Sequence, residues 1–189
     1  IEFLKEYLPT NPIPVILVSS LNLKVFDALA AGAVDFVRKP STEDTQASFI
    51  TALAQKVLVA SMSRVRVARP SAVSAAGAAA AAAAASASPT GLLGGNPALN
   101  SVVIGLGAST GGTEATLEVM KRLPADIPPM VIVQHMPKGF TAMYANRLNN
   151  LCQMEVREAK NGDELRRGLA LVAPADLQAR IVRIGDKYT

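Results

Sequence analysis

The sequence has 189 residues, of which 50% are hydrophobic and 18% charged, a composition typical of a globular protein with one large or two small domains. The formal net charge of +4 comes largely from three arginines between residues 64 and 69, so no nucleic-acid-binding face is expected. The single cysteine excludes an internal disulfide and a cysteine-based structural zinc site. Without a signal-peptide pattern or a run of about 20 apolar residues, we expect a cytoplasmic protein with no membrane insertion.

Residues 1–63 alternate between helix and strand patterns. In chain order they predict a helix over 3–8, a strand over 15–20, a helix ending at Gly32, a strand over 34–37, and a helix over 49–62 with apolar residues at Phe49, Leu53, Val57 and Leu58. The first strand is a continuous apolar run and should be buried on both faces. This order predicts half of a doubly wound α/β sheet.

Residues 64–100 consist mainly of alanine, serine, glycine and proline. Such a segment cannot bury enough apolar surface to form a core. We interpret it as a linker between a first domain over 1–63 and a second over 101–189.

The second domain repeats the α/β pattern. It predicts a strand ending at Gly107, a helix over 113–123, a strand over 130–135 and a helix over 139–148. Residues expected to share the inner faces of these helices are Thr116, Val119, Met120 and Leu123, then Phe140, Met143, Tyr144 and Leu148. The short crossovers imply adjacent parallel strands. The later segments, around turns at Asn161–Gly162 and Gly185–Asp186, favour antiparallel strands.

The loop GLGASTGG, residues 105–112, joins the first strand and helix of this domain. It lacks the lysine of a P-loop, and its spacing misses the G-x-G-x-x-G fingerprint of dinucleotide-binding sites. Gly107, Ser109 and Gly111 do fit G-x-S-x-G, where glycines permit a tight turn that projects a serine hydroxyl and aims amides at an oxyanion. A plain glycine-lined turn is an equal alternative for so short a motif.

His135 is the only histidine, and it follows the neighbouring strand at the edge where Ser109 lies. A serine needs such a base to act as a nucleophile, although a structural strand-end histidine is the alternative. Asp163, Asp176 and Asp186 all lie in turn-like contexts, so each is interpreted as a solvated turn residue rather than the orienting carboxylate. Cys152 is interpreted as a buried small side chain rather than a reactive thiol.

The segments VIGLGASTGGTEAT, IVQHMPKGFTAMYANRLNNLC and EAKNGDELRRGLALVAP resemble the catalytic domain of the CheB family, the chemotaxis protein-glutamate methylesterases and glutamine deamidases. PVILVSS and ALAAGAVDFVRKP resemble the receiver domain that precedes it in that family. The resemblance implies a partial receiver domain with a doubly wound, flavodoxin-like fold, a linker, and a partial Rossmann-like α/β methylesterase domain with a mainly parallel sheet.

For the second domain, the resemblance implies that Ser109 is the nucleophile of a serine hydrolase and His135 its general base. It also places Gly107, Thr110, Gly111 and Gly112 in the nucleophile and oxyanion loop. The family's triad aspartate is expected beyond Thr189, so the chain alone is expected to be inactive. The implied substrates are glutamyl methyl esters and glutamines of methyl-accepting chemotaxis receptors, with no cofactor in the catalytic domain.

For the first domain, the resemblance implies a response regulator. Ser19 and Lys39 match the receiver's switch positions, with Lys39–Pro40 expected as a cis peptide; a strand-end cap and a solvated charge are the structural alternatives. Mg²⁺ is implied for the complete receiver, with its acidic ligands and phospho-accepting aspartate expected before Ile1. A chemotaxis histidine kinase is the implied phosphodonor. The rival function is a non-catalytic adaptor that binds receptor or kinase.

Overall fold

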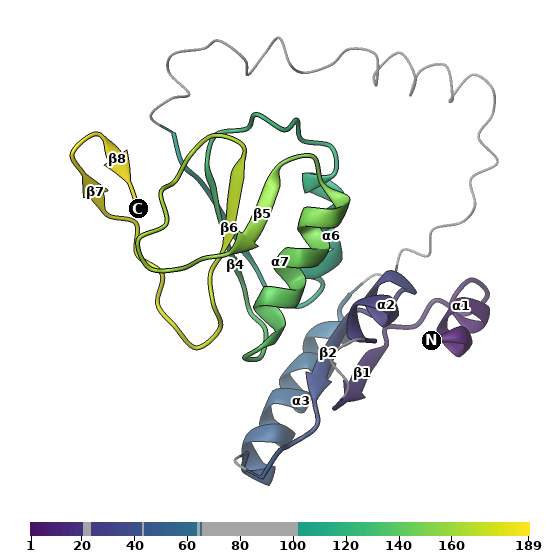
Figure 1. Cartoon of the computed structure of the whole chain (residues 1–189). Coiled ribbons are helices and arrows are strands. Elements are labelled where there is room, and N and C mark those ends of the chain that lie inside the picture. Colours follow the sequence, from purple (N-terminus) through teal and green to yellow (C-terminus); the bar gives the residue numbers. More distant parts are fainter. Residues whose placement is uncertain (21–23, 43, 64, 66–101) are drawn as a thin grey trace, which may run out of the picture.

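The computed structural model describes most of the chain, namely residues 1–20, 24–42, 44–63, 65 and 102–189. Nearly all of the predicted linker lies outside the described residues, and the domain boundaries at 63 and 101 stay predictions. Figure 1 shows two groups of elements, each built around its own parallel strands. No helix in the described part of the chain is long and apolar enough to cross a membrane.

The first group contains two strands and three helices, as predicted. Its elements are α1 (Glu2–Tyr7), β1 (Ile16–Ser19), α2 (Val25–Ala30), β2 (Asp35–Arg38) and α3 (Gln46–Ser61). The strands pair in parallel, with Ser19 opposite Arg38 at their carboxyl ends. Gly32 adopts a φ of +105° just after α2, a left-handed conformation that disfavours other residues, so the predicted glycine stop is confirmed.

Burial in this group is lower than the apolar patterns suggest. Strand β1 was expected to be buried on both faces, but all four of its residues are only half-buried, because it has one strand neighbour among the described elements. Helix α3 leaves Val57 and Leu58 50% and 65% exposed. It attaches to β2 through Lys56, whose Nζ lies 2.9 Å from the Asp35 carboxylate and donates to the Phe36 carbonyl at 2.9 Å.

The peptide bond between Lys39 and Pro40 is trans, since no cis bond occurs in the described residues, so the expected cis bond is wrong. The trans isomer is intrinsically favoured before proline unless the surrounding structure selects the other. Here the turn is closed without it, because Asp44 accepts hydrogen bonds from the Ser41 backbone N–H at 2.8 Å and from the Arg38 guanidinium at 2.9 Å.

The second group holds a four-stranded sheet in the order β3-β4-β6-β5. Its elements are β3 (Ile104–Ala108), α6 (Gly112–Met120), β4 (Met130–Gln134), α7 (Phe140–Leu151), β5 (Glu155–Glu158) and β6 (Leu169–Val172). Strands β3 and β4 are parallel neighbours, as predicted. Helices α6 and α7 pack together on one face of the sheet (Figure 1).

The prediction of antiparallel strands after α7 is wrong for β5 and β6, which join the sheet in parallel. The turn at Asn161–Gly162 lies within a connection over 159–168, long enough to carry the chain back and insert β6 between β4 and β5. Among the described strands, only β7 (Arg183–Ile184) and β8 (Lys187–Tyr188) are antiparallel, around the predicted turn at Gly185–Asp186.

The core of the second group lies beneath its two helices. Most of the predicted inner residues are buried, with Met120, Tyr144 and Leu148 fully so. Val119 was expected on the inner face but is 53% exposed, and its neighbour Leu117 is buried instead. The inner face of α6 is therefore centred on Leu117 and Met120 rather than on Val119.

The two groups share one continuous hydrophobic core. Phe26 on α2 stacks on Tyr144 of α7 with ring centroids 6.0 Å apart, and Phe36 on β2 meets Phe140 at 4.7 Å. The Arg147 guanidinium also lies over the Phe26 ring, 5.6 Å from its centroid. These contacts place the carboxyl end of β2 against the carboxyl edge of the four-stranded sheet.

Candidate functional site

Ser109 and His135 lie side by side at the carboxyl edge of the sheet. Strand β3 ends at Ala108, one residue before Ser109, and β4 ends at Gln134, one residue before His135. Ala108 and Gln134 are partners in the parallel register of the two strands. The His135 N–H donates to the Ala108 carbonyl at 3.0 Å. Because neighbouring strands are about 4.8 Å apart, the structure brings together the two residues predicted to be nucleophile and base.

The turn after Ser109 leads straight into α6 at the glycine pair. Gly111 has a φ of +75°, and the Gly112 N–H donates to the Ser109 carbonyl at 2.8 Å. A side chain at Gly112 has no room, because a Cβ there would lie 2.5 Å from the Ala108 Cβ and 2.6 Å from the Gln134 Oε1. The glycines are thus required by left-handed backbone at one position and close packing at the next.

The polar groups of this turn are open to solvent or to a ligand. Ser109 and His135 are both exposed, and in the described part of the chain neither side chain makes a hydrogen bond. The Thr110 N–H donates to no acceptor among the described residues, and it lies at the amino end of α6, where backbone donors and the helix dipole favour negative charge. The arrangement leaves a hydroxyl, an imidazole and an amide donor available at one edge.

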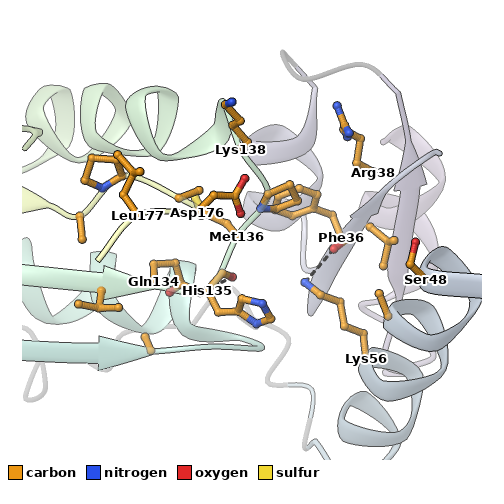
Figure 2. Close-up of a pocket in the computed structure, with 18 of the residues that line it drawn as sticks. Phe36, Arg38, Ser48, Lys56, Gln134, His135, Met136, Lys138, Asp176 and Leu177 are labelled. Atoms are coloured by element: carbon orange, nitrogen blue, oxygen red, sulfur yellow. Dashed lines mark hydrogen bonds between the residues drawn. The ribbon is translucent and has the colours of Figure 1, made fainter. Parts of the chain in front are cut away.

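His135 lines a cleft of about 730 Å³ between the two groups of elements (Figure 2). Gly107 and Lys138 contribute to the wall on the four-stranded side, and Phe36 and Lys56 contribute from β2 and α3. The strand edge that carries His135 therefore faces the first group of elements rather than open solvent alone.

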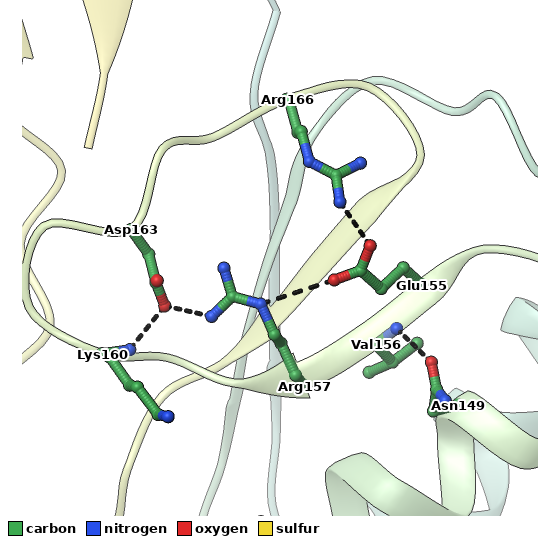
Figure 3. A network of polar contacts seen from close by, with 7 residues as sticks. All are labelled: Asn149, Glu155, Val156, Arg157, Lys160, Asp163 and Arg166. Atoms are coloured by element: carbon green, nitrogen blue, oxygen red, sulfur yellow. Dashed lines mark hydrogen bonds and ion pairs between the residues drawn. The ribbon is translucent and has the colours of Figure 1, made fainter.

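Two of the three aspartates considered as orienting carboxylates are held elsewhere. Asp163 pairs with Arg157 and accepts the Lys160 backbone N–H (Figure 3), and the hydrogen bond from Arg157 lowers the pKa of its carboxyl. Asp186 is fully exposed near Arg183. Both are turn residues, as interpreted from the sequence.

Asp176 differs from the other two because it lines the same cleft as His135 (Figure 2). Its φ of 62° is the one positive value outside glycine in the described residues. It makes no hydrogen bond to His135, although both side chains are described. The structure therefore assigns an orienting carboxylate to none of the three.

Comparison with known proteins identifies the region that carries this site. Residues 104–188 match the family model described as CheB methylesterase. This region of the chain is therefore similar to CheB methylesterases. The match contains Ser109, His135 and the glycine turn between them.

Curated relatives extend the similarity along the whole chain. It is 42% identical over 190 residues to a protein-glutamate methylesterase/protein-glutamine glutaminase 2 of Syntrophomonas wolfei, and 37% identical over 194 residues to the protein-glutamate methylesterase/protein-glutamine glutaminase of Salmonella typhimurium. Both alignments cover 100% of this chain and 51% of the relative, so the chain spans about half the length of the curated relatives it matches.

Solved structures match as well. The crystal structure of the Thermotoga maritima CheB methylesterase catalytic domain is 36% identical to this chain, with a TM-score of 0.44, and covers 46% of each chain.

The receiver positions lie at the other strand edge. Ser19 is half-buried at the end of β1, and Lys39 is exposed just after β2, with its N–H donating to the Ser19 carbonyl at 3.0 Å. Among the described residues no three histidine, cysteine or acidic side chains gather into a metal site. The Ser19 and Lys39 pair offers no carboxylate, so these residues do not by themselves fit the Mg²⁺ implied for a complete receiver.

Cys152 lies apart from the turn at residues 109–112, at the end of α7, half-buried against the core. Desolvation raises the pKa of its thiol, which keeps the thiolate scarce at neutral pH. Its interpretation as a packing residue fits these surroundings better than a nucleophilic role.

Sequence reasoning missed Gln134, which lies between the two predicted catalytic residues. Its side chain is buried, with 6% exposed, and its Nε2 donates to the Ser109 carbonyl at 2.9 Å and to the His135 carbonyl at 3.3 Å. One signal could have found it, because it is the only polar residue inside the otherwise apolar strand MVIVQ.

Proposed function

We propose that this chain supplies the nucleophile and the general base of a protein-glutamate methylesterase and glutamine deamidase of bacterial chemotaxis. The observation that carries the proposal is the pairing of two strand ends, where Ser109 and His135 follow neighbouring parallel strands in register. The glycine turn beside them leaves the Thr110 amide without an acceptor among the described residues. The names of the curated relatives supply the substrate class.

In the proposed mechanism, the His135 imidazole takes the Ser109 hydroxyl proton as the oxygen attacks the γ-carbonyl of a glutamyl methyl ester. The Thr110 N–H stabilises the resulting oxyanion at the amino end of α6. The C–O bond to the methoxy group breaks and methanol leaves with the proton from His135. Water, activated by His135, then cleaves the acyl-serine ester and restores the glutamate carboxylate; a glutamine substrate releases ammonia instead.

The first group of elements is proposed to be part of a receiver domain that regulates this edge. Ser19 and Lys39 would form its switch pair, and a chemotaxis histidine kinase would be the phosphodonor. The observation in support is the cleft that Phe36 and Lys56 share with His135, since a receiver in this position restricts access of a receptor segment. Phosphorylation would then activate the enzyme by moving the receiver away from the sheet edge.

Methanol release from methylated chemoreceptors tests the nucleophile. In the full-length enzyme that carries this chain, Ser109→Ala should lower kcat by at least about 10³-fold, as loss of a serine nucleophile does in other serine hydrolases. Ser61→Ala is the matched control, because Ser61 is exposed on α3 and its hydroxyl donates to the Leu58 carbonyl of the same helix. Turnover that survives Ser109→Ala would contradict the proposal and favour the non-catalytic adaptor that binds receptor or kinase.

A further inference from the structure

Gln134 contacts the backbone of both proposed catalytic residues, although its own side chain is buried. Its Nε2 donates to the carbonyl oxygens of Ser109 and His135 at 2.9 and 3.3 Å. Two acceptors face one end of the amide, and only the NH₂ end can donate to both. The side chain therefore links the nucleophile turn after β3 to the strand end that carries the base.

The packing around this amide is tight and specific. Its other polar atom, Oε1, is buried and has no hydrogen-bond partner among the described residues. A Cβ at Gly112 would come within 2.6 Å of it. A buried acceptor without a partner costs about 1–3 kcal/mol, which makes glutamine a poor choice for stability alone. An apolar side chain of similar shape would avoid that cost.

The effect on the turn follows from the planarity of the peptide bond. The Ser109 carbonyl and the Thr110 N–H belong to one peptide group and point in opposite directions. Gln134 Nε2 and the Gly112 N–H both hold the Ser109 carbonyl toward the interior, at 2.9 and 2.8 Å. The Thr110 N–H is thereby directed away from the interior, and it finds no acceptor among the described residues.

We infer that Gln134 is a positioning residue, whose buried side-chain amide fixes the peptide between Ser109 and Thr110 and so aims the oxyanion donor. This inference rests on the proposed function, because an aimed amide matters only where an oxyanion forms. Gln134 lines the same cleft as His135, but its side chain is buried. It acts through the Ser109 carbonyl, and to a lesser extent through that of His135.

The test is Gln134→Met in the full-length enzyme, assayed by methanol release from methylated receptor. Methionine keeps the length of the side chain and removes both donors and the unpartnered acceptor, and the Ser109 carbonyl retains the Gly112 N–H. We expect kcat to fall about 10- to 100-fold, less than or equal to the loss from deleting an oxyanion donor, with KM changed less than twofold. Ser109 labelling by a fluorophosphonate should slow in parallel.

Gln153→Met is the matched control, because Gln153 is exposed in the turn after α7 and should leave kcat and labelling unchanged. If Gln134→Met prevents folding, Gln134→Asn gives the same test by withdrawing the amide one methylene. A folded Gln134 variant with kcat and labelling within twofold of wild type would overturn the inference. Loss of activity in Ser109→Ala alongside that result leaves the proposed function intact, whereas an active Ser109→Ala overturns both.

Discussion

Two pairs of parallel strands in this molecule end alike. Ser19 closes β1 and Lys39 follows β2, while Ser109 follows β3 and His135 follows β4. In each pair the N–H of the second residue bonds across to the neighbouring strand at 3.0 Å, from Lys39 to Ser19 and from His135 to Ala108. Each pair of strand ends therefore carries one hydroxyl residue and one basic residue.

The difference lies in the residue opposite each first strand end. Arg38 faces Ser19 in the register and turns outward to pair with Asp44, whereas Gln134 faces Ala108 and turns inward under the nucleophile turn. The contrast teaches that a parallel sheet brings polar residues together at its edge, but the packing beneath the edge decides whether the backbone is held for chemistry.

If the two sheets folded independently, their strand ends could not be compared as parts of one core. Phe26→Ala tests whether they do, and it has the largest expected effect on stability. Phe26 is 8% exposed and contacts both the Tyr144 ring and the Arg147 guanidinium. Its truncation should lower the free energy of unfolding by about 3 kcal/mol or more, measured by urea denaturation of the full-length protein. Phe3→Ala is the control, since Phe3 is 64% exposed. Separate transitions for the two sheets, with only one displaced, would contradict a shared core.

The two pairs of strand ends differ more clearly if only the pair at β3 and β4 depends on close backbone packing. In Gly112→Ala, the new Cβ would lie 2.5 Å from the Ala108 Cβ and 2.6 Å from the Gln134 Oε1, so the neighbouring side chains must move. This movement should cost about 1–3 kcal/mol of stability. We also expect kcat for methyl ester hydrolysis to fall at least about tenfold. Gly105→Ala is matched, because a Cβ there meets nothing within 4 Å. Equal behaviour of the two variants would show that the turn tolerates repacking.

The smallest expected effect on stability concerns Tyr144. Its hydroxyl donates to the carbonyl of Thr113 at 3.3 Å, directly after the turn at residues 109–112. Burial raises the pKa of Tyr144 to about 12, so the folded state keeps the phenol neutral after the unfolded chain ionises near pH 10. The contribution of Tyr144 to the free energy of unfolding is therefore fully present below pH 10. Above pH 10 it falls, by up to about 1.4 kcal/mol per pH unit, until pH 12.

Denaturation of wild type and Tyr144→Phe between pH 9 and 11.5 measures this contribution, because the difference between the two proteins should shrink as pH rises. Absorbance of the phenolate adds a direct reading, with one of the three tyrosines titrating last. Titration of all three near pH 10 would show that Tyr144 is accessible and that the core behind the turn is open.

The sequence predicted the strand ends well, because they depend on local patterns. The apolar run 130–134 and the glycines at 111 and 112 were enough to place Ser109 and His135 at one edge. The partners of β5 and β6 could not be predicted in this way, since Asn161–Gly162 signals a turn without showing which strands it connects. The strand MVIVQ marks Gln134 as a polar residue among apolar ones, but its contact with the Ser109 carbonyl depends on the register between β3 and β4.

The contact of Ala108, Gly112 and Gln134 has a consequence for how such sequences can diverge. The three side-chain positions share one small volume, so each limits the size allowed at the other two. Among related proteins these positions should change together, with a larger residue at 112 appearing only where 108 or 134 has become smaller. Substitutions that are harmful one at a time would then be tolerated as a set.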